Sequence, residues 1–172
     1  GTSLSFGTAV VFENASTVWT TAVYDSTNGK IVIAYSDQGN SSYGTAIVGT
    51  VSGTSISFGT AVVFENANTS YTSATYDSTN NKVVIAYRDQ GNSSYGTAIV
   101  GTVSGTSISF GTAVVFNAET TSYIVATFDS TNAKVVIAYV DGSNYGTAVV
   151  GTVSGTSISF GAEVVFNAAF TY

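Results

Sequence analysis

Short apolar runs alternate with turn-forming residues along the whole chain. Residues 53–104 show the pattern, with runs at Ile56–Phe64, Tyr71–Tyr76, Lys82–Tyr87 and Tyr95–Val103. The first run alternates apolar and small residues with a period of two, which predicts a strand with one buried face. The third run is apolar at successive positions, as in a strand covered on both faces. Val, Ile, Thr, Tyr and Phe fill the runs, so the pattern favours β-strands over helices.

This pattern repeats almost without change. Residues 1–52 and 53–104 align without gaps and differ at nine positions. Residues 105–154 form a third unit that is two residues shorter, and residues 155–172 begin a fourth. Repeats of this kind build arrays of similar structural units, so we interpret residues 1–172 as a single repeat domain.

Four antiparallel strands in each unit predict the blade of a β-propeller. The second run carries the small side chains of Thr72, Ser73 and Ala74, which suit the crowded inner strand of a blade. The predicted order outward is therefore the second, third and fourth runs, then the first run of the following unit. The fold class is predicted to be all-β, a propeller-like array of three four-stranded antiparallel blades from Trp19 to Phe166, with a surplus N-terminal strand at Ser3–Phe12.

Three such blades do not close a ring, because propellers have about four or more. Three arrangements stay open. Copies of the chain assemble into a ring, or the surplus strand adds to a neighbour and builds an open β-sheet fibre by strand exchange, or the chain is a piece of a longer array. The expected partner is in each case the chain itself or its repeat.

A six-residue turn joins the second and third runs of every unit. It is Asp77–Lys82 in the second unit, and Asp25–Lys30 and Asp129–Lys134 repeat it. We expect the Asp to cap the turn, the Asn to take a positive φ and the Lys to pair with the Asp across the turn. The segment therefore predicts a tight hairpin.

Composition excludes much chemistry. Thr, Ser, Gly and Asn supply 80 of the 172 residues, and Cys and His are absent. Disulfides, thiolate nucleophiles and a Ser-His-Asp triad are therefore excluded. A net charge of −6 with only four cations argues against a nucleic-acid partner. The sequence has no apolar stretch of about 18 residues, which argues against membrane insertion. No cofactor is expected.

A ligand site is predicted at the end of the array where the loops between second and third strands meet the connections from one blade to the next. The aromatic candidates there are Trp19, Tyr71, Tyr123, Tyr43, Tyr95 and Tyr145, and the polar candidates are Asp37, Asp89, Asp141, Asn40, Asn92 and Asn144. Aromatic faces beside amide and carboxylate groups suit sugars, and a weak site repeated in every unit gains from avidity.

Other interpretations of this end stay open. The Tyr and Asn residues could pack neighbouring blades and cap turns. The Asp-Gln-Gly-Asn segments offer oxygen atoms to calcium but lack the spacing of a calcium loop, so no metal site is predicted. Catalytic carboxylates are disfavoured because the acids recur in every unit. The candidate glycosylation positions are Asn14, Asn40, Asn68 and Asn92.

The motifs SGTSISFGTxVVFN, YDSTNxKVVIAY and GNSxYGTAxVGTV together resemble a repeat of surface and tail-associated proteins of marine bacteria and their phages. The resemblance covers nearly the whole chain and implies an extracellular, cell-surface or virion-surface location. The YDSTNxKVVIAY hairpin alone is similar to hairpins of lectin and sialidase propellers. Arg88 is the only Arg, and the SxDxGxxW signature of sialidases is absent, so no sialidase site residue carries over.

These observations favour a non-enzymatic extracellular repeat protein for adhesion or receptor recognition, which binds glycans through its blade-end loops. The first alternative is a structural protein that assembles into a fibre or sheath by β-strand addition between subunits. The second alternative is a propeller of the glycoside hydrolase type.

Overall fold

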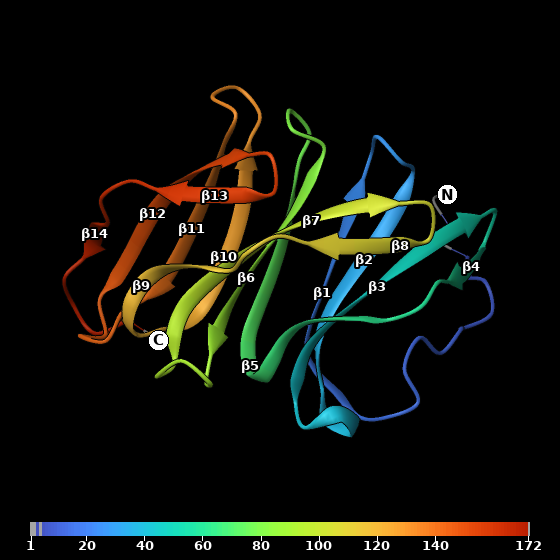
Figure 1. Ribbon diagram of the computed structural model, residues 1–172, viewed down its shortest axis with the longest axis horizontal. Helices are drawn as coiled ribbons and strands as arrows, with labels where there is room; N and C mark the ends of the chain where they lie inside the picture. The colour runs from blue at the N-terminus through green and yellow to red at the C-terminus, as the bar shows by residue number, and fades with distance from the viewer. Residues whose placement is uncertain (1–2, 4, 172) are drawn as a thin grey trace.

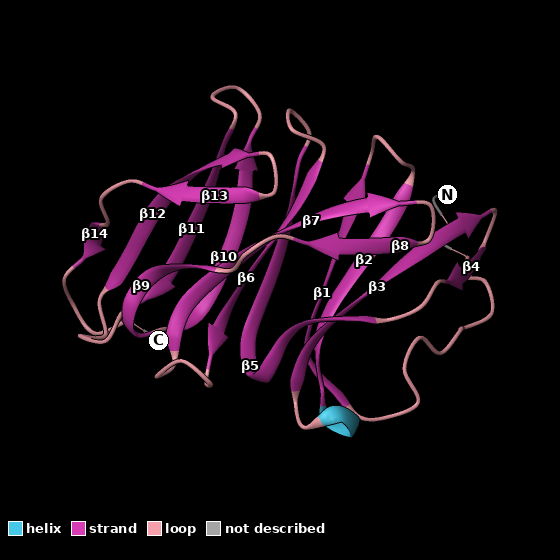
Figure 2. Cartoon of the chain, viewed as in Figure 1, coloured by secondary structure: helices cyan, strands magenta, loops and turns pink. Residues whose placement is uncertain are grey.

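Strands make up almost all of the regular structure. The computed structural model describes residues 3 and 5–171, and its strands form two antiparallel sheets, neither of them closed (Figure 1). Within those residues the one helical element is a 3-10 turn, η1 (Gln38–Asn40), cyan in Figure 2. The strands are β1 (Thr17–Asp25), β2 (Lys30–Asp37), β3 (Tyr43–Ser52), β4 (Ser55–Phe58), β5 (Val62–Asp77), β6 (Lys82–Asp89), β7 (Tyr95–Ser104), β8 (Ser107–Phe110), β9 (Val114–Thr120), β10 (Ser122–Asp129), β11 (Lys134–Val140), β12 (Gly146–Ser154), β13 (Ser157–Phe160) and β14 (Val164–Asn167). The predicted all-β class is confirmed.

The strands fall into three unit sheets with one common order. We define the first unit sheet as β1, β2, β3 and an outer strand made of β4 and the start of β5. The second is the rest of β5 with β6, β7, β8 and β9, and the third is β10 to β14. Because β5 runs from the outer edge of the first unit sheet to the inner edge of the second, these two form one nine-stranded sheet. The order within each unit sheet is the predicted one.

The outer strand of each unit sheet is broken in its middle. β4 pairs with the end of β3 and β5 with its start, while between them Gly59 donates its N–H to the carbonyl of Val48 at 2.9 Å. Gly111 and Gly161 repeat this bond in the other two unit sheets. The prediction of one continuous strand over Ile56–Phe64 was wrong, because one extra residue on the outer strand forces a β-bulge at this point.

The predicted surplus strand at Ser3–Phe12 is also not observed. The described residues from 3 to 16 form no strand, and Leu4 lies outside the described residues. The segment instead lies against the first unit sheet, where the ring centroid of Phe12 is 5.2 Å from that of Tyr35. A strand needs a neighbouring edge to bond with, and none of the described strands offers a free edge to this segment.

The hydrophobic core lies between the unit sheets. We call the contact between successive unit sheets a joint, the face turned to the following unit sheet the trailing face, and the opposite face the leading face. At the first joint, the trailing residues Val32, Ala34, Ala46 and Val48 pack with the leading residues Val83, Ile85, Tyr87 and Ile99. At the second joint, the equivalent residues are Val84, Ala86, Ala98 and Val100 with Val135, Ile137, Tyr139 and Val149. Burial on both faces explains why the third run is apolar at successive positions.

Asp77 caps the hairpin turn between β5 and β6. Its Oδ1 accepts the N–H groups of Thr79 at 2.9 Å and Asn80 at 3.0 Å, and its Oδ2 accepts the Asn80 amide at 2.7 Å. Asp25 and Asp129 accept the same three bonds in their own turns. The predicted capping role of the Asp is confirmed.

Two expectations for this turn were wrong. The positive φ falls on the variable residue before the Lys, which is an Asn only in the second unit (Asn81) and is Gly29 or Ala133 in the others, so the expected Asn is found in one turn of three. The Asn before this position is held by its bonds to the Asp. The Lys30 amine donates to the hydroxyl of Thr50 at 2.8 Å, and Lys134 bonds its Thr in the same way. The Asp oxygens are already occupied by turn donors, so the Lys stabilises the neighbouring strand instead.

The Asp25 turn gives the stability a dependence on pH. Burial raises the pKa of the Asp25 carboxyl, but the hydrogen bonds from the side chain and backbone of Asn28 outweigh it, so the net pKa lies below its ordinary value. Such a group adds stability above its unfolded pKa of about 4, and this is lost as pH falls through the lower folded pKa.

We therefore expect Asp25→Asn, which keeps one oxygen acceptor but removes the charge, to be less stable than the wild type at pH 5 to 7. The difference should shrink below about pH 4. Urea unfolding of both proteins across this range measures it. A difference that stays constant from pH 7 to pH 3 would contradict the role given to the Asp25 charge.

Candidate functional site

Three aromatic residues at equivalent positions form a row across the inner edges of the unit sheets. The ring centroids of Trp19 and Tyr71 are 4.4 Å apart, and those of Tyr71 and Tyr123 are 5.2 Å apart. Trp19 is 45% exposed and Tyr123 is 53% exposed. All three are candidates from the sequence, and the structure brings them into contact. We call them the aromatic row.

Each residue of the row sits on a β-bulge with a left-handed backbone. The pairing of β1 with β2 shifts register between Val18 and Thr21, and β5 and β10 show the same shift. The φ angles are 55° at Trp19, 51° at Tyr71 and 52° at Tyr123. This conformation costs an L-residue with a bulky side chain about 1 kcal/mol or more. The fold bears that cost at all three positions, so interactions of the surrounding structure offset it.

The bulges also bond one unit sheet to the next. The Ala74 N–H donates to Thr21 Oγ1 at 3.4 Å, and the Ala126 N–H donates to Ser73 Oγ at 3.0 Å. The third unit has Val125 at this position, which is 62% exposed and has no hydroxyl. This seam was not foreseen, although the run of small hydroxyl residues next to the row is a signal for it.

The three acidic candidates close the loops that follow the second strand of each unit sheet. Asp37 Oδ1 accepts the Gly39 N–H at 2.9 Å, Asp89 Oδ1 accepts the Gly91 N–H at 2.9 Å, and Asp141 Oδ1 accepts the Ser143 N–H at 2.9 Å. Asp37 and Asp89 are 8% and 7% exposed. Their oxygens therefore stabilise the loops and offer little surface to a ligand, as the turn-capping interpretation expects.

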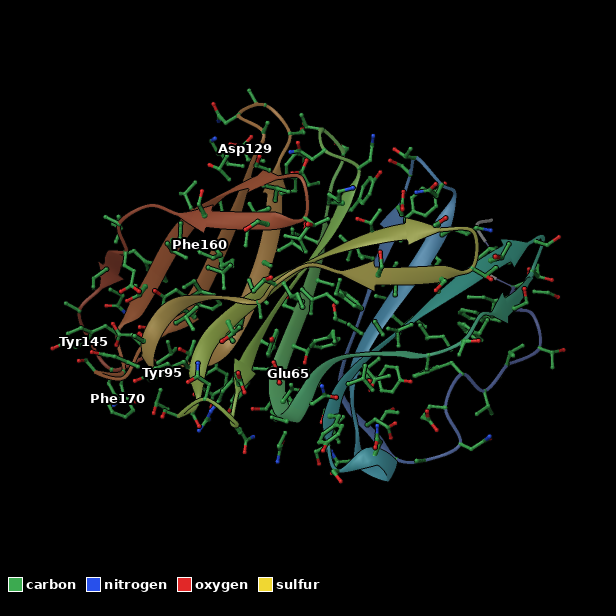
Figure 3. The ribbon with its side chains drawn as sticks, viewed as in Figure 1. Glu65, Tyr95, Asp129, Tyr145, Phe160 and Phe170 are labelled. Atoms are coloured by element: carbon green, nitrogen blue, oxygen red, sulfur yellow. The ribbon has the colours of Figure 1, made fainter. Side chains whose placement is uncertain are left out.

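The remaining candidates lie at the same end but away from the row. Figure 3 shows Tyr95 and Tyr145 at the lower edge of the molecule, with Asp129 at the opposite edge. These Tyr residues, with Tyr43, precede or begin the third strand of each unit sheet, two strands from the row. The structure records no ring contact between them and the row among the described residues. The amide candidates Asn40, Asn92 and Asn144 are exposed on the loops.

A cavity of about 240 Å³ lies beside the last ring of the row. It brings together three candidates, Tyr123, Asp141 and Asn144, with Phe170 and Thr171. At Tyr71 the corresponding side of the ring is covered by Tyr123. The cavity lies on the side of Tyr123 that no unit sheet of the described residues covers, and its lining by residues 170–171 was not foreseen.

A carboxyl group with a raised pKa lies near the same end. Burial, and then repulsion by Asp89, raise the pKa of Glu65. The Tyr87 hydroxyl donates to Glu65 Oε2 at 3.0 Å, and burial raises the pKa of that hydroxyl strongly. Tyr35 donates to Glu13 in the same way at 3.3 Å. The Glu65–Tyr87 pair lies at the first joint, and the Glu13–Tyr35 pair repeats it between the N-terminal segment and the first unit sheet, so we assign both pairs a packing role.

Arg88 was noted in the sequence only as the single Arg. Its guanidinium carbon lies 6.0 Å from the Tyr71 ring centroid, which is within the range of a cation–π contact. It replaces the Ser36 of the first unit. The substitution places one positive charge beside the middle ring of the row.

The candidate glycosylation positions Asn14, Asn40, Asn68 and Asn92 are all exposed. Across residues 3 and 5–171, no group of three or more acidic, His or Cys side chains is placed to hold a metal ion. In the same part of the chain, no helix has the length and apolar character needed to cross a membrane.

We compared the chain with protein-family models, with curated proteins and with solved structures, and none of the three comparisons found a match.

Proposed function

We propose that the three unit sheets are blades of a β-propeller arc, and that the chain is a non-enzymatic extracellular protein that binds carbohydrate through the aromatic row. The observation that supports this is the row itself, three rings held in contact at equivalent positions with both end rings about half exposed. The strand order within each unit sheet is consistent with a blade.

Sugar recognition accounts for the exposure of the row. Aromatic rings that serve only to pack a core are normally buried, whereas a sugar needs open ring surface for its C–H groups. The exposed amides of Asn40 and Asn92 lie on loops at the same end and would donate to and accept from hydroxyl groups. Weak contacts repeated along the row would add by avidity.

Glycan-array binding tests this proposal. We expect the double variant Trp19→Ala and Tyr123→Ala to bind at least about tenfold more weakly than the wild type, because both open ring surfaces are lost. The matched control is Tyr24→Ala, which removes a 57% exposed ring at the opposite end of β1. The proposal fails if the wild type binds no glycan, or if Tyr24→Ala weakens binding as much as the double variant.

A second candidate function is structural, as a subunit of a fibre or sheath. The observation that favours it is that the array of unit sheets is open at both ends. In this candidate function the partner is another copy of the chain.

A further inference from the structure

The trailing face of the third unit sheet carries the residues of a joint, but no unit sheet of the described residues packs on it. Val136, Ala138, Ala148 and Val150 are the equivalents of the trailing residues of the first two unit sheets. Val150 is 45% exposed, whereas its equivalents Val48 and Val100 are completely buried. An apolar sheet face that is buried twice in the same chain is here open to solvent.

Phe166 shows the same contrast. At the first joint Phe64 contacts Tyr87 and Phe110, with centroid distances of 5.2 and 5.7 Å. At the second joint Phe116 contacts Tyr139 and Phe160, at 5.1 and 5.7 Å. Phe166 occupies the equivalent position on the third unit sheet and is 64% exposed. Among the described residues, no Tyr and Phe pair packs against Phe166 as one does at each internal joint.

The complementary face is on the first unit sheet. Its leading face carries Ile31, Ile33, Ile47, Val51 and Ile56, the equivalents of leading residues that are buried at the first joint. Val51 is 53% exposed, whereas its equivalents Val103 and Val153 are 7% and 6% exposed. The open face of the third unit sheet and this leading face, which is exposed at Val51 but covered at Ile47, therefore match each other as the faces of each internal joint do.

We propose that the trailing face of the third unit sheet binds the leading face of the first unit sheet in a second copy of this chain, with Phe166 between Tyr35 and Phe58 of that copy. This contact would continue the two internal joints, which place residues from equivalent positions in the same arrangement. The contact is heterologous, so repeated association produces a ring or a filament.

In the monomer the N-terminal segment occupies part of this binding face. Phe12 contacts Tyr35 at 5.2 Å and Phe58 at 6.0 Å, which is the arrangement of Phe64 and Phe116 at the internal joints. The segment has no strand pairing in its described residues, and Phe6 and Val11 are 85% and 71% exposed. It is thus a weakly held internal competitor that an incoming Phe166 displaces.

The joint between copies is weaker than the joints within the chain. Thr21 and Ser73 each accept one hydrogen bond from the next unit sheet, but the equivalent residue of the third unit sheet is Val125, which has no hydroxyl. The joint between copies therefore lacks a hydrogen bond that both internal joints have. Displacing residues 5–12 also breaks the contacts of Phe12 with Tyr35 and Phe58, which makes the free energy of association less favourable. We expect association to be reversible and dependent on protein concentration.

Two glycines give a matched test. A Cβ on Gly59 or Gly111 would overlap the carbonyl oxygen of Thr106 or Thr156 across its joint, and a Cβ on Gly7 would overlap that of Thr54. A Cβ on Gly161 meets only the Val150 oxygen at 3.8 Å in the monomer. In the proposed joint, Gly161 lies against Thr54 of the second copy, so Gly161→Ala clashes only when copies associate.

We measure association by sedimentation velocity over a wide range of concentration, with circular dichroism as the check on folding. Gly161→Ala should weaken association at least about tenfold, and Phe166→Ser should do the same, because both change only the open face. Gly7→Ala should strengthen association at least about tenfold, because it expels the competing segment. Val115→Ala is the control and should leave association unchanged, because Val115 and its equivalent Val63 stay 38% and 37% exposed on unit sheets that already form joints.

A closed ring and an open filament both support the proposal if Gly161→Ala and Phe166→Ser suppress them. The proposal is overturned if the wild type and the Gly7→Ala variant both stay monomeric at every concentration. Association that neither Gly161→Ala nor Phe166→Ser weakens overturns it as well. Glycan binding by the monomer is a separate outcome and does not depend on this result.

Discussion

Replacing Phe116 with alanine is expected to lower the free energy of unfolding by about 4 kcal/mol. Phe116 is 6% exposed and packs its ring against Tyr139 and Phe160 at the second joint. Truncation removes the buried ring and leaves a cavity between two unit sheets. The hydrogen-bonded backbones of these sheets are too rigid to move together and fill it. Equilibrium unfolding in urea, followed by tyrosine and tryptophan fluorescence, measures the loss.

The control is the same change at Phe166, which is 64% exposed. At concentrations where the chain is monomeric, we expect Phe166→Ala to lower the free energy of unfolding by less than about 1 kcal/mol. The reason is that most of the Phe166 ring is already exposed to solvent, so its removal loses little buried apolar surface. Equal losses for the two variants would mean that the second joint does not bury Phe116 as described, and would contradict the placement of the core between unit sheets.

Replacing Asp77 with alanine is expected to cost about 3 kcal/mol. Its carboxylate is fully buried and accepts three hydrogen bonds in the turn between β5 and β6. The variant leaves the Thr79 and Asn80 N–H groups without their acceptor beside the first joint, where water has little access. Thermal and urea unfolding both measure this loss.

The same substitution at Asp129 provides the comparison, because that carboxylate accepts the same three bonds in a solvent-exposed turn. Water replaces the lost acceptor there, so the loss should be less than half of that for Asp77→Ala. If Asp129→Ala is the more damaging variant, burial against the neighbouring unit sheet is not what makes the Asp77 turn important.

Much of the fold was predictable because the repeat period restricts it. Apolar residues at successive positions of Val83–Tyr87 indicated a strand buried on both faces, and β6 is that strand. The small residues around Ser73 indicated the inner edge of each unit sheet, which is where they lie. The placement of the candidate site at one end followed from the alternation of antiparallel strands.

The N-terminal segment shows where sequence alone fails. Residues 5–12 are identical to residues 57–64, yet one segment belongs to a paired outer strand and the other does not. The difference is the presence or absence of a neighbouring third strand, which local sequence does not encode. Pairing partners distant in sequence decide strand formation, and propensity is a weak guide to them.

The conformation of the aromatic row was also not predictable. Left-handed residues are usually Gly, Asn or Asp, and the sequence offers Trp19, Tyr71 and Tyr123 instead. The sequence placed these rings at the correct end but gave no sign of the bulge that puts them in contact. The packing of three rings across three unit sheets is a property of the assembled array.

The identity of the two joints has a consequence for how such genes change. Each unit sheet contacts only its neighbours, and each joint uses side chains from equivalent positions, most of them of the same type. Recombination that inserts or removes one whole unit therefore leaves every remaining joint chemically intact. A deletion of an odd number of residues within a strand would turn its apolar side chains to the opposite face. Selection can thus lengthen or shorten the array in whole units without redesigning its core.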